Sequence, residues 1–311
     1  MNENDVLDRL RQIATDPAAR GLLDDVALVG DLVATHDTIA EGVHFLPEDP
    51  PDSVGWKLVT VNLSDLAAKG AEPLAALLSL TLAGDEEWEL RFLNGIAAAC
   101  ESYGLPLVGG DTIALPSSAP RVLGLTVLGR AGPNTPPRSG GQIGDALWLV
   151  GTVGDSAAGL AQLQNDRKAH GPLVDIYRRP IPLLDAGQRL AVHAHAMMDV
   201  SDGLLLDARR LALASNCGAI IHLDLVPLSD DFIAERGSDH EARLFAATGG
   251  DDYALLAALP ADFDPALRLS LPSRPSFTRI GSLVAPGPPL SLVSGGRPVG
   301  LPERLGFEHA G

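Results

Sequence analysis

Lysine is scarce in this chain, and no stretch of it is strongly basic. Of its 311 residues only three are lysine (Lys57, Lys69 and Lys168), and the formal net charge is −17. A protein that binds nucleic acid needs a basic stripe to neutralise phosphates, and anionic membrane surfaces attract basic segments in the same way. We therefore expect neither a nucleic acid nor a membrane as a partner.

Cysteine and long hydrophobic runs are also scarce. The two cysteines, Cys100 and Cys217, do not belong to a set with metal-ligand spacing. A disulfide framework is not indicated, which favours a reducing compartment. No run approaches the ~20 apolar residues that span a bilayer, and the first residues lack the basic and apolar segments of a signal peptide. The sequence therefore predicts a cytoplasmic protein.

Aromatic residues make up 4% of the chain, whereas hydrophobic residues as a whole make up 46%. Aliphatic side chains and alanine must therefore fill the core. The length allows one large domain or two ordinary ones, since single cores stop growing near ~250–300 residues. Residues 131–144 (AGPNTPPRSGGQIG) are rich in Pro and Gly and are the best candidate for a linker. We expect domains at residues 1–135 and 136–311.

Helix-like and strand-like stretches are intermixed in both halves without a regular β-α-β-α alternation. This favours a two-domain α+β fold over a doubly wound sheet. Strands are predicted over residues 32–35, 74–82, 122–128, 146–150, 219–223, 254–258, 279–283 and 290–293. Helices are predicted over residues 53–69, 86–103, 156–164, 183–194 and 204–215, the first with Ser53 as its N-cap.

Several common phosphate-binding and nucleophile motifs are absent. The chain has no GxxxxGK[ST] loop, no GxGxxG opening a helix, no HRD/DFG pair and no GxSxG nucleophile elbow. What it has instead is aspartates beside glycines or within apolar runs. These are Asp24, Asp25, Asp37, Asp65, Asp111, Asp199, Asp202, Asp251 and Asp252.

A carboxylate among apolar neighbours must find a cation or several hydrogen-bond donors. Magnesium prefers oxygen ligands and commonly bridges a few carboxylates to nucleotide phosphates. Many aspartates with few lysines therefore indicate a site whose positive charge comes mainly from metal. Each aspartate alone also has a structural interpretation. Asp202 is a candidate N-cap of the helix at 204–215, Asp65 a candidate surface partner of Lys69, Asp111 a residue of an ordinary turn, and nearby His44 a structural histidine.

Taken in order, these motifs resemble those of the thiamine-monophosphate kinases, a family of the aminoimidazole ribonucleotide synthetase-like superfamily. The resemblance extends from about residue 21 to 309. It is carried by residues 23–28 (LDDVAL), 37–45 (DTIAEGVHF), 61–71 (VNLSDLAAKGA), 109–112 (GGDT), 151–160 (GTVGDSAAGL), 199–204 (DVSDGL) and 249–253 (GGDDY). The resemblance implies ATP- and Mg²⁺-dependent phosphorylation of thiamine monophosphate to thiamine diphosphate, by direct in-line transfer of the γ-phosphate. It also implies a homodimer that pairs through its N-terminal sheets.

The resemblance further implies roles for individual residues. Metal ligands would be Asp25, Thr35, His36, Asp37, Asp65, Asp111, Asp199 and Asp202. Among them, Asp25, Asp65, Asp111 and Asp202 are the expected catalytic residues. ATP would contact Tyr103, Gly110, Arg138 and Ser201, and the thiamine moiety would contact His44, Asp251 and Phe307. An aromatic such as Phe307 can stack on a flat cationic ring.

The chain departs from the family pattern at three positions. The first motif reads Gly21-Leu22-Leu23-Asp24-Asp25 in place of Gly-x-Gly-Asp-Asp, and Asp251 stands where the family usually has glutamate. Lys69 replaces a methionine, a change that we expect a helix surface to tolerate. Two other functions stay open at this point: another ATP-using synthetase of the superfamily, and a non-catalytic protein that binds thiamine phosphates.

Overall fold

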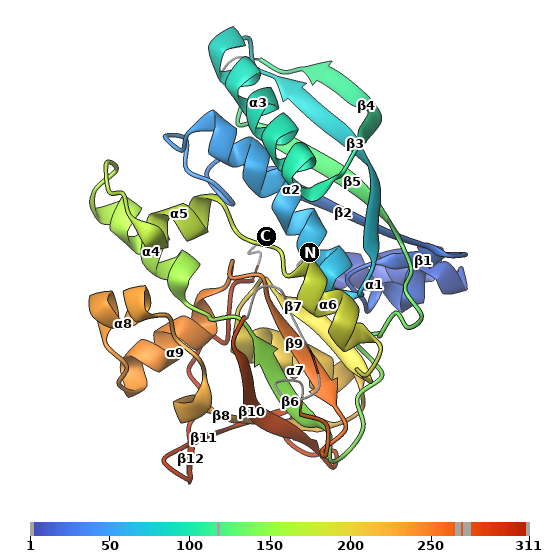
Figure 1. Ribbon diagram of the computed structural model, residues 1–311, viewed down its shortest axis with the longest axis vertical. Coiled ribbons are helices and arrows are strands. Elements are labelled where there is room, and N and C mark those ends of the chain that lie inside the picture. The colour runs from blue at the N-terminus through green and yellow to red at the C-terminus, as the bar shows by residue number, and fades with distance from the viewer. Residues whose placement is uncertain (1–2, 117–118, 265–268, 270–274, 309–311) are drawn as a thin grey trace.

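Two β-sheets, each accompanied by helices, lie one above the other (Figure 1). The computed structural model describes residues 3–116, 119–264, 269 and 275–308. The upper sheet in Figure 1 has five strands and the lower sheet has seven. Both sheets mix parallel and antiparallel pairing. The α+β class expected from the sequence is confirmed.

The N-terminal sheet has the order β1-β2-β5-β3-β4 and is antiparallel except between β3 and β4. Helix α2 packs on β2 and β5, and helix α3 packs on α2. The elements of this half are α1 (Glu3–Ile13), a 3-10 helix η1 (Pro17–Leu22), β1 (Ala27–Val29), β2 (Leu32–Ala40), α2 (Pro51–Ala68), β3 (Glu72–Leu82), α3 (Glu86–Tyr103), β4 (Leu107–Ala114) and β5 (Val122–Arg130).

The C-terminal sheet has the order β12-β11-β8-β10-β6-β9-β7, and helices cover both of its faces. Strands β6, β7 and β9 are therefore buried along their whole length, which explains the continuous apolar runs of β6 and β9. The elements are β6 (Ala146–Val150), α4 (Asp155–Asn165), α5 (Pro172–Arg178), α6 (Leu184–Ala191), β7 (Ala196–Val200), α7 (Leu204–Ala214), β8 (Gly218–His222), η2 (Leu223–Leu225), α8 (Asp230–Arg236), α9 (His240–Gly249), β9 (Ala254–Leu259), β10 (Phe277–Val284), β11 (Leu290–Ser294) and β12 (Arg297–Val299).

Helix α2 joins the two halves. Two glycines bring other helices against its backbone: a Cβ on Gly95 of α3 would lie 2.0 Å from the Asp52 oxygen, and one on Gly187 of α6 would lie 2.0 Å from the Ala67 oxygen. Because α2 is enclosed from several sides, its buried residues include polar ones, among them Lys57 and Asp65. Among the described residues, no helix is both long and apolar enough to span a membrane.

The structure differs from the sequence-based expectations in a few places. Helix α2 begins at Pro51 with Pro50 at the cap position, so Ser53 lies inside the helix and the predicted N-cap is wrong. Gly109 to Asp111 lie within strand β4 rather than in a turn. Strand β2 continues to Ala40, beyond the predicted end at residue 35, because its polar residues also pair with β5. Strands β4 and β7, which carry Asp111 and Asp199, were not predicted.

Candidate metal and phosphate site

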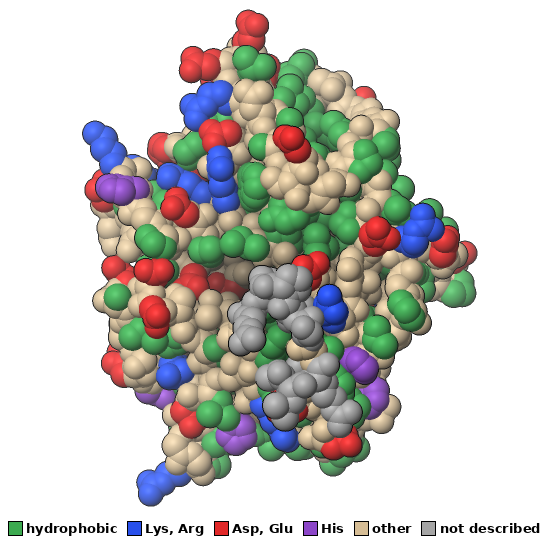
Figure 2. Space-filling model, in the orientation of Figure 1, with side chains coloured by type: hydrophobic (Ala, Val, Ile, Leu, Met, Phe, Trp, Pro, Cys, Tyr) green, Lys and Arg blue, Asp and Glu red, His purple; other side chains and the backbone are tan. Residues whose placement is uncertain are grey.

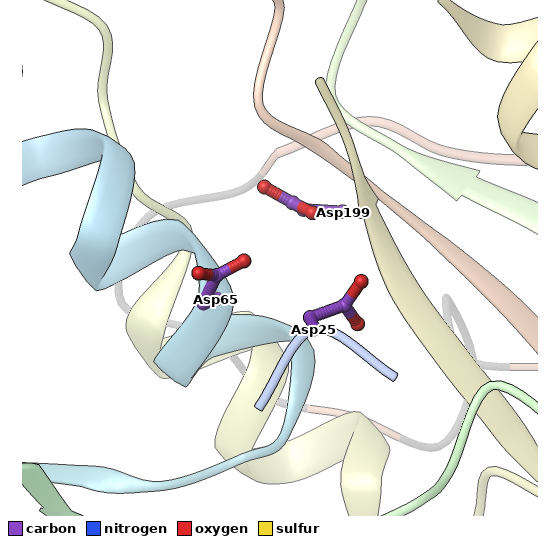
Figure 3. A group of neighbouring side chains, drawn as sticks. All are labelled: Asp25, Asp65 and Asp199. Atoms are coloured by element: carbon purple, nitrogen blue, oxygen red, sulfur yellow. The ribbon is translucent and has the colours of Figure 1, made fainter. Parts of the chain in front are cut away.

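Three aspartates from separate parts of the chain meet where the two halves adjoin (Figure 3). Asp25 precedes strand β1, Asp65 lies in helix α2, and Asp199 lies in strand β7. One carboxylate oxygen of each lies within 4.8 Å of the others. This separation suits oxygen ligands that share one divalent cation. The residues present therefore fit the Mg²⁺ predicted from the sequence.

Burial gives this cluster its electrostatic character. Burial and then the charge of Asp25 raise the pKa of Asp199 to about 8, although the Ser64 hydroxyl donates to its Oδ2 at 2.7 Å. Burial, followed by the charges of Asp37, Asp199 and Asp25, raises the pKa of Asp65 well above its usual value. The hydroxyl of Thr35 donates to Asp65. These carboxyls resist ionisation until a cation arrives, as expected of a desolvated metal site.

Asp37 and Asp202 lie beside the cluster. Burial, together with the charges of Asp25 and Asp202, raises the pKa of Asp37 to about 6. The backbone N–H of Asp37 donates to the Asn62 side chain of α2 at 3.0 Å, so this stretch of β2 is bonded to the helix that carries Asp65. Asp202 lies two residues after the end of β7. Five of the predicted metal-binding aspartates therefore come together in one region of one chain.

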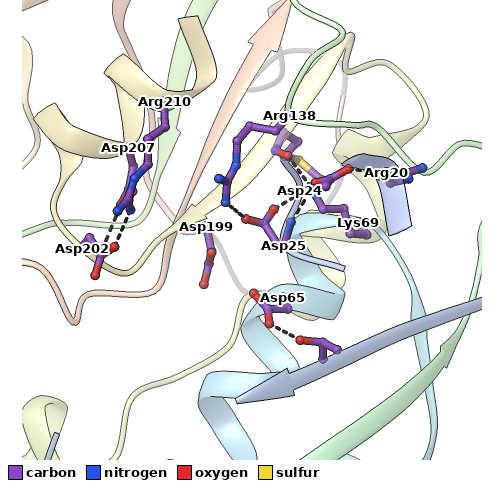
Figure 4. A network of polar contacts seen from close by, with 12 residues as sticks. Arg20, Asp24, Asp25, Asp65, Lys69, Arg138, Asp199, Asp202, Asp207 and Arg210 are labelled. Atoms are coloured by element: carbon purple, nitrogen blue, oxygen red, sulfur yellow. Dashed lines mark hydrogen bonds and ion pairs between the residues drawn. The ribbon is translucent and has the colours of Figure 1, made fainter. Parts of the chain in front are cut away.

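Asp25 differs from its neighbours because both of its oxygens meet cations (Figure 4). Arg138 donates to Oδ1, and the Lys69 ammonium lies 2.6 Å from Oδ2. Burial would raise the pKa of Asp25, but the charges of Arg138 and Lys69 outweigh burial and hold it well below its usual value. Asp25 is therefore ionised before any metal binds.

Lys69 is fully buried, so the expectation that it lies on a helix surface is wrong. Its ammonium lies 2.5 Å from Oδ1 of Asp24, beside Asp25, and donates to the Met197 carbonyl at 2.8 Å. Asp65 is bonded to Thr35 of β2, so the alternative of an Asp65–Lys69 surface pair is also wrong. Lys69 thus connects the end of α2 to the loop before β1 and to β7.

A second arginine occupies the other side of the cluster. Arg210 of α7 donates to Asp202, and to Asp207 at 2.9 Å. The backbone N–H of Asp202 donates to the other oxygen of Asp207 at 3.1 Å. Gly203 holds the cap position of α7 without a side-chain cap hydrogen bond, so the interpretation of Asp202 as an N-cap is wrong. Asp202 is held instead by the guanidinium.

Asp111 and Gly110 lie away from the cluster within one chain. Asp37 pairs with Leu125, Leu125 with Leu78, and Leu78 with Gly110, so β4 is three strands away from β2. At about 4.8 Å per strand this separates the two backbones by about 14 Å. Every residue of β4 is exposed. The roles predicted for Asp111 and Gly110 stay predictions.

Two further residues predicted from the resemblance lie outside the cluster. The His36 ring points to the opposite side of β2 from Thr35, because its Nδ1 bonds to the Thr126 hydroxyl at 2.8 Å. The His36 ring is therefore directed away from the cluster within one chain. Tyr103 ends α3 and packs edge-on against Trp56 of α2, with 5.9 Å between the ring centroids. Burial raises the pKa of Tyr103, so its hydroxyl is neutral.

The loop at residues 201–202, directly after β7, is also bonded to two residues expected to contact the thiamine moiety. The Asp251 backbone N–H donates to the Ser201 carbonyl at 2.6 Å, and the Phe307 N–H donates to the Asp202 carbonyl at 2.8 Å. The segment that carries Phe307, near the C-terminal end of the described chain, therefore lies against this loop. His44 lies in the turn after β2, where its Nδ1 accepts from the Ala40 N–H at 3.0 Å.

Sequence reasoning gave no role to Lys57, Asp207 or Arg210, and it placed Lys69 on a helix surface. One signal in the sequence could have indicated that Lys57 and Lys69 are buried: lysine is scarce, yet two of the three lysines fall within or directly after one apolar helix. A lysine at such a position needs an anionic partner if it is buried. Asp207 and Arg210 have the i,i+3 spacing of an ordinary helix-surface pair and carried no further signal.

Removing the Lys69 ammonium should destabilise the protein strongly. We expect Lys69→Met to lower the free energy of unfolding by about 3–5 kcal/mol, because Asp24 and Asp25 lose a buried counter-charge. Urea unfolding measures the change. Lys168→Met, at an exposed lysine, should change stability by less than about 0.5 kcal/mol. Equal stability of the two variants would contradict the buried role of Lys69.

Metal binding should release protons. With a folded pKa of about 8 against an unfolded value of 3.8, Asp199 holds a proton that is lost as pH rises, so the metal-free protein loses stability between pH 4 and 8. We expect Mg²⁺ to raise the melting temperature more at pH 8.5 than at pH 6. Calorimetry at pH 7 in buffers of different ionisation enthalpy should show proton release, reduced in Asp199→Asn. Identical heats in all buffers would exclude this coupling.

The chain matches two family models in sequence. Residues 23–131 match the N-terminal domain of AIR synthase related proteins, and residues 142–286 match the C-terminal domain. The thiamine-monophosphate kinase of Escherichia coli K12 is 38% identical over 97% of this chain and 95% of its own. The same-named enzyme of Caulobacter vibrioides is 38% identical over 94% of this chain and 86% of its own.

Solved structures give the same result. AaThiL complexed with AMPPCP and TMP superposes with a TM-score of 0.85 at 30% identity, covering 99% of this chain and 97% of its own. Thiamine-monophosphate kinase from Stenotrophomonas maltophilia K279a has a TM-score of 0.76 at 35% identity, covering 95% and 96%. The hydrogenase maturation protein HypE, at 20% identity and a TM-score of 0.69, shares the fold. The chain therefore belongs to the thiamine-monophosphate kinases, a family built from the two AIR synthase related domains.

Proposed function

We propose that this chain transfers the terminal phosphate of ATP to thiamine monophosphate, forming thiamine diphosphate. The observation that carries the proposal is the likeness, over 99% of this chain, to a structure that holds AMPPCP and TMP. The buried aspartate cluster supports it, because a site built from carboxylates suits a metal nucleotide. A reaction between small dissolved substrates also fits the cytoplasmic location predicted from the composition.

Mg²⁺ is the proposed cofactor. Asp25, Asp65 and Asp199 would hold it, with Asp37 and Asp202 beside them as further ligands. When bound, it would neutralise phosphate charge and orient the phosphate groups. Five carboxylates in a desolvated region repel a polyanionic substrate unless cations compensate. This is the physical reason to expect that nucleotide binding depends on metal.

The protein's own cations are the second part of the mechanism. Arg138 and Arg210 border the cluster on two sides, and both donate to carboxylates. Guanidinium groups also bind phosphate oxygens through two parallel hydrogen bonds. The acceptor is a phosphate monoester that is already anionic near neutral pH, so no strong general base is needed. We propose direct in-line transfer, in which these residues position the two phosphates.

The thiamine moiety would lie beside the loop at residues 201–202. Asp251 and Phe307 are both bonded to this loop through their backbones. The Phe307 residue is 45% exposed, and an aromatic ring can stack on a flat cation. We propose Asp251, Phe307 and His44 as residues that contact the thiamine rings.

We also propose a homodimer in which β4 of one chain completes the site of the other. Hydrophobic side chains gather on the N-terminal part of the molecule (Figure 2). The exposed ones on its sheet are Val29, Leu77, Leu107, Val108, Ile113 and Val122. An exposed edge strand with apolar residues is a surface that proteins normally cover. Since Asp111 is about 14 Å from Asp37 across the sheet, it would reach a metal cluster only in the partner chain.

The reaction is tested by ADP release from ATP and Mg²⁺ with thiamine monophosphate, free thiamine or no acceptor, with thiamine diphosphate assayed directly. We expect release with the monophosphate, in equal amount to the diphosphate formed. Asp65→Asn and Asp199→Asn should each lower kcat/KM by about a hundredfold or more, whereas Asp231→Asn, at an exposed position of α8, should not. Turnover without diphosphate formation would overturn the assignment.

The shared site is tested by complementation. Asp65→Asn and Asp111→Asn homodimers should be nearly inactive, but co-expressed mixed dimers should contain one intact site. Random pairing makes half of the dimers mixed, so activity should recover to about one quarter of wild type. Asp65→Asn with Asp199→Asn is the control, since both act in the same cluster and should not complement. Equal recovery in both mixtures, or in neither, would contradict the shared site.

A further inference from the structure

Lys57 is a buried lysine for which the proposed reaction supplies no role. It lies in helix α2, its side chain is 3% exposed, and its ammonium lies 2.5 Å from Oδ2 of Asp251. The same ammonium donates to the Tyr177 carbonyl at 3.1 Å and lies 4.2 Å from the centre of the Tyr177 ring. All of these partners belong to the C-terminal half. Burying an ammonium is unfavourable without such partners, so the position of Lys57 is tied to Asp251.

Asp251 is held by several independent contacts. The Ser156 hydroxyl donates to its Oδ2 at 2.9 Å, and the Tyr253 hydroxyl donates to its Oδ1 at 2.9 Å. Its backbone has φ of 63°, in the left-handed region that non-glycine residues adopt rarely. Its N–H donates to the carbonyl of Ser201. A side chain and backbone so fixed present the carboxylate in one orientation.

The fixed carboxylate still has room for a ligand. The Asp251 side chain is 32% exposed, whereas that of Lys57 is almost fully covered. Each carboxylate oxygen has two lone pairs, and within the described part of the chain the Tyr253 hydroxyl is the side-chain donor to Oδ1. An incoming amino group can therefore bond to Asp251 without displacing Lys57.

Lys57 also changes how the Asp251 carboxylate interacts with a ligand. An isolated carboxylate would attract any cation, but the Lys57–Asp251 pair is neutral as a unit. It therefore acts as an oriented hydrogen-bond acceptor, which selects for donor geometry more than for charge. Asp251 is one methylene shorter than the glutamate usual in the family, so its reach depends more strongly on the neighbours that hold it.

We propose that Lys57 is a positioning residue that orients the Asp251 carboxylate for the amino group of the thiamine moiety. The inference rests on the proposed function. It makes recognition of the acceptor depend on helix α2, the helix that also supplies Asp65 to the metal cluster. Lys57 acts through Asp251 and does not itself contact the substrate.

The test is steady-state kinetics of Lys57→Met, Lys57→Arg, Asp251→Asn and the double variant, with both substrates varied. We expect Lys57→Met to raise KM for thiamine monophosphate about tenfold, as for the loss of one charge-assisted hydrogen bond, while KM for ATP stays within about twofold. Lys57→Arg should recover most of the loss. The double variant should be no worse than Asp251→Asn, because Lys57 acts through that carboxylate.

Ser53→Ala is the matched control. Ser53 lies one turn before Lys57, and its hydroxyl accepts from Arg179 at 3.4 Å, so this variant removes a contact between the halves without touching Asp251. We expect it to leave both KM values unchanged. Melting temperatures of all variants separate loss of folding from loss of recognition, and Lys57→Arg supplies the comparison if Lys57→Met does not fold.

Three results would overturn the proposal: an unchanged KM for thiamine monophosphate in Lys57→Met, an equal rise in both KM values, or additive losses in the double variant. Additive losses would mean that Lys57 binds the substrate directly. Wild-type protein that releases no ADP with thiamine monophosphate would instead overturn the proposed function. Wild-type turnover combined with any of the three results removes only the role of Lys57.

Discussion

The burial of helix α2 between the two halves is the constraint on which the site depends. Its polar side chains have lost water and must find partners in the protein. Asn62 and Asp65 bond to strand β2, whereas Ser64 and Lys57 bond to Asp199 and to the Asp251 loop of the other half. The bonds of Ser64 and Lys57 therefore also fix the position of one half relative to the other. The carboxylates converge because the helix between them is enclosed.

Desolvation divides the carboxylates of the cluster into two kinds. Asp25 is held ionised by Lys69 and Arg138, whereas burial keeps Asp65 and Asp199 reluctant to ionise. While no cation is bound, only Asp25 carries a permanent negative charge, so repulsion among the three carboxyl groups is limited. The same arrangement leaves strong oxygen ligands available once a metal binds.

The sequence predicted the fold class, most helices and the aspartates that converge, because apolar periods and family motifs are local signals, whereas both predicted N-caps, Ser53 and Asp202, were wrong. It could not predict the environment of Lys69. Residues 51–68 are apolar on most sides, so their pattern has no face that distinguishes solvent from core. Nor could it place Asp111, because strand order is a property of the whole sheet. Strand β7 was missed since its five residues directly follow a helical pattern, and Asp199 was located by motif alone.

The buried ion pairs of Lys69 also constrain which substitutions the neighbouring positions can accept during evolution. A lysine introduced at this buried position is tolerated only where Asp24 and Asp25 already stand 2.5 and 2.6 Å from its ammonium. Once the lysine is present, replacing Asp24 with an apolar residue removes one of its two carboxylate partners. With methionine at position 69, the same replacement would remove no ion pair. The substitution thus makes later change at Asp24 conditional on the residue at 69. Positions 24 and 69 are therefore expected to vary together among close relatives.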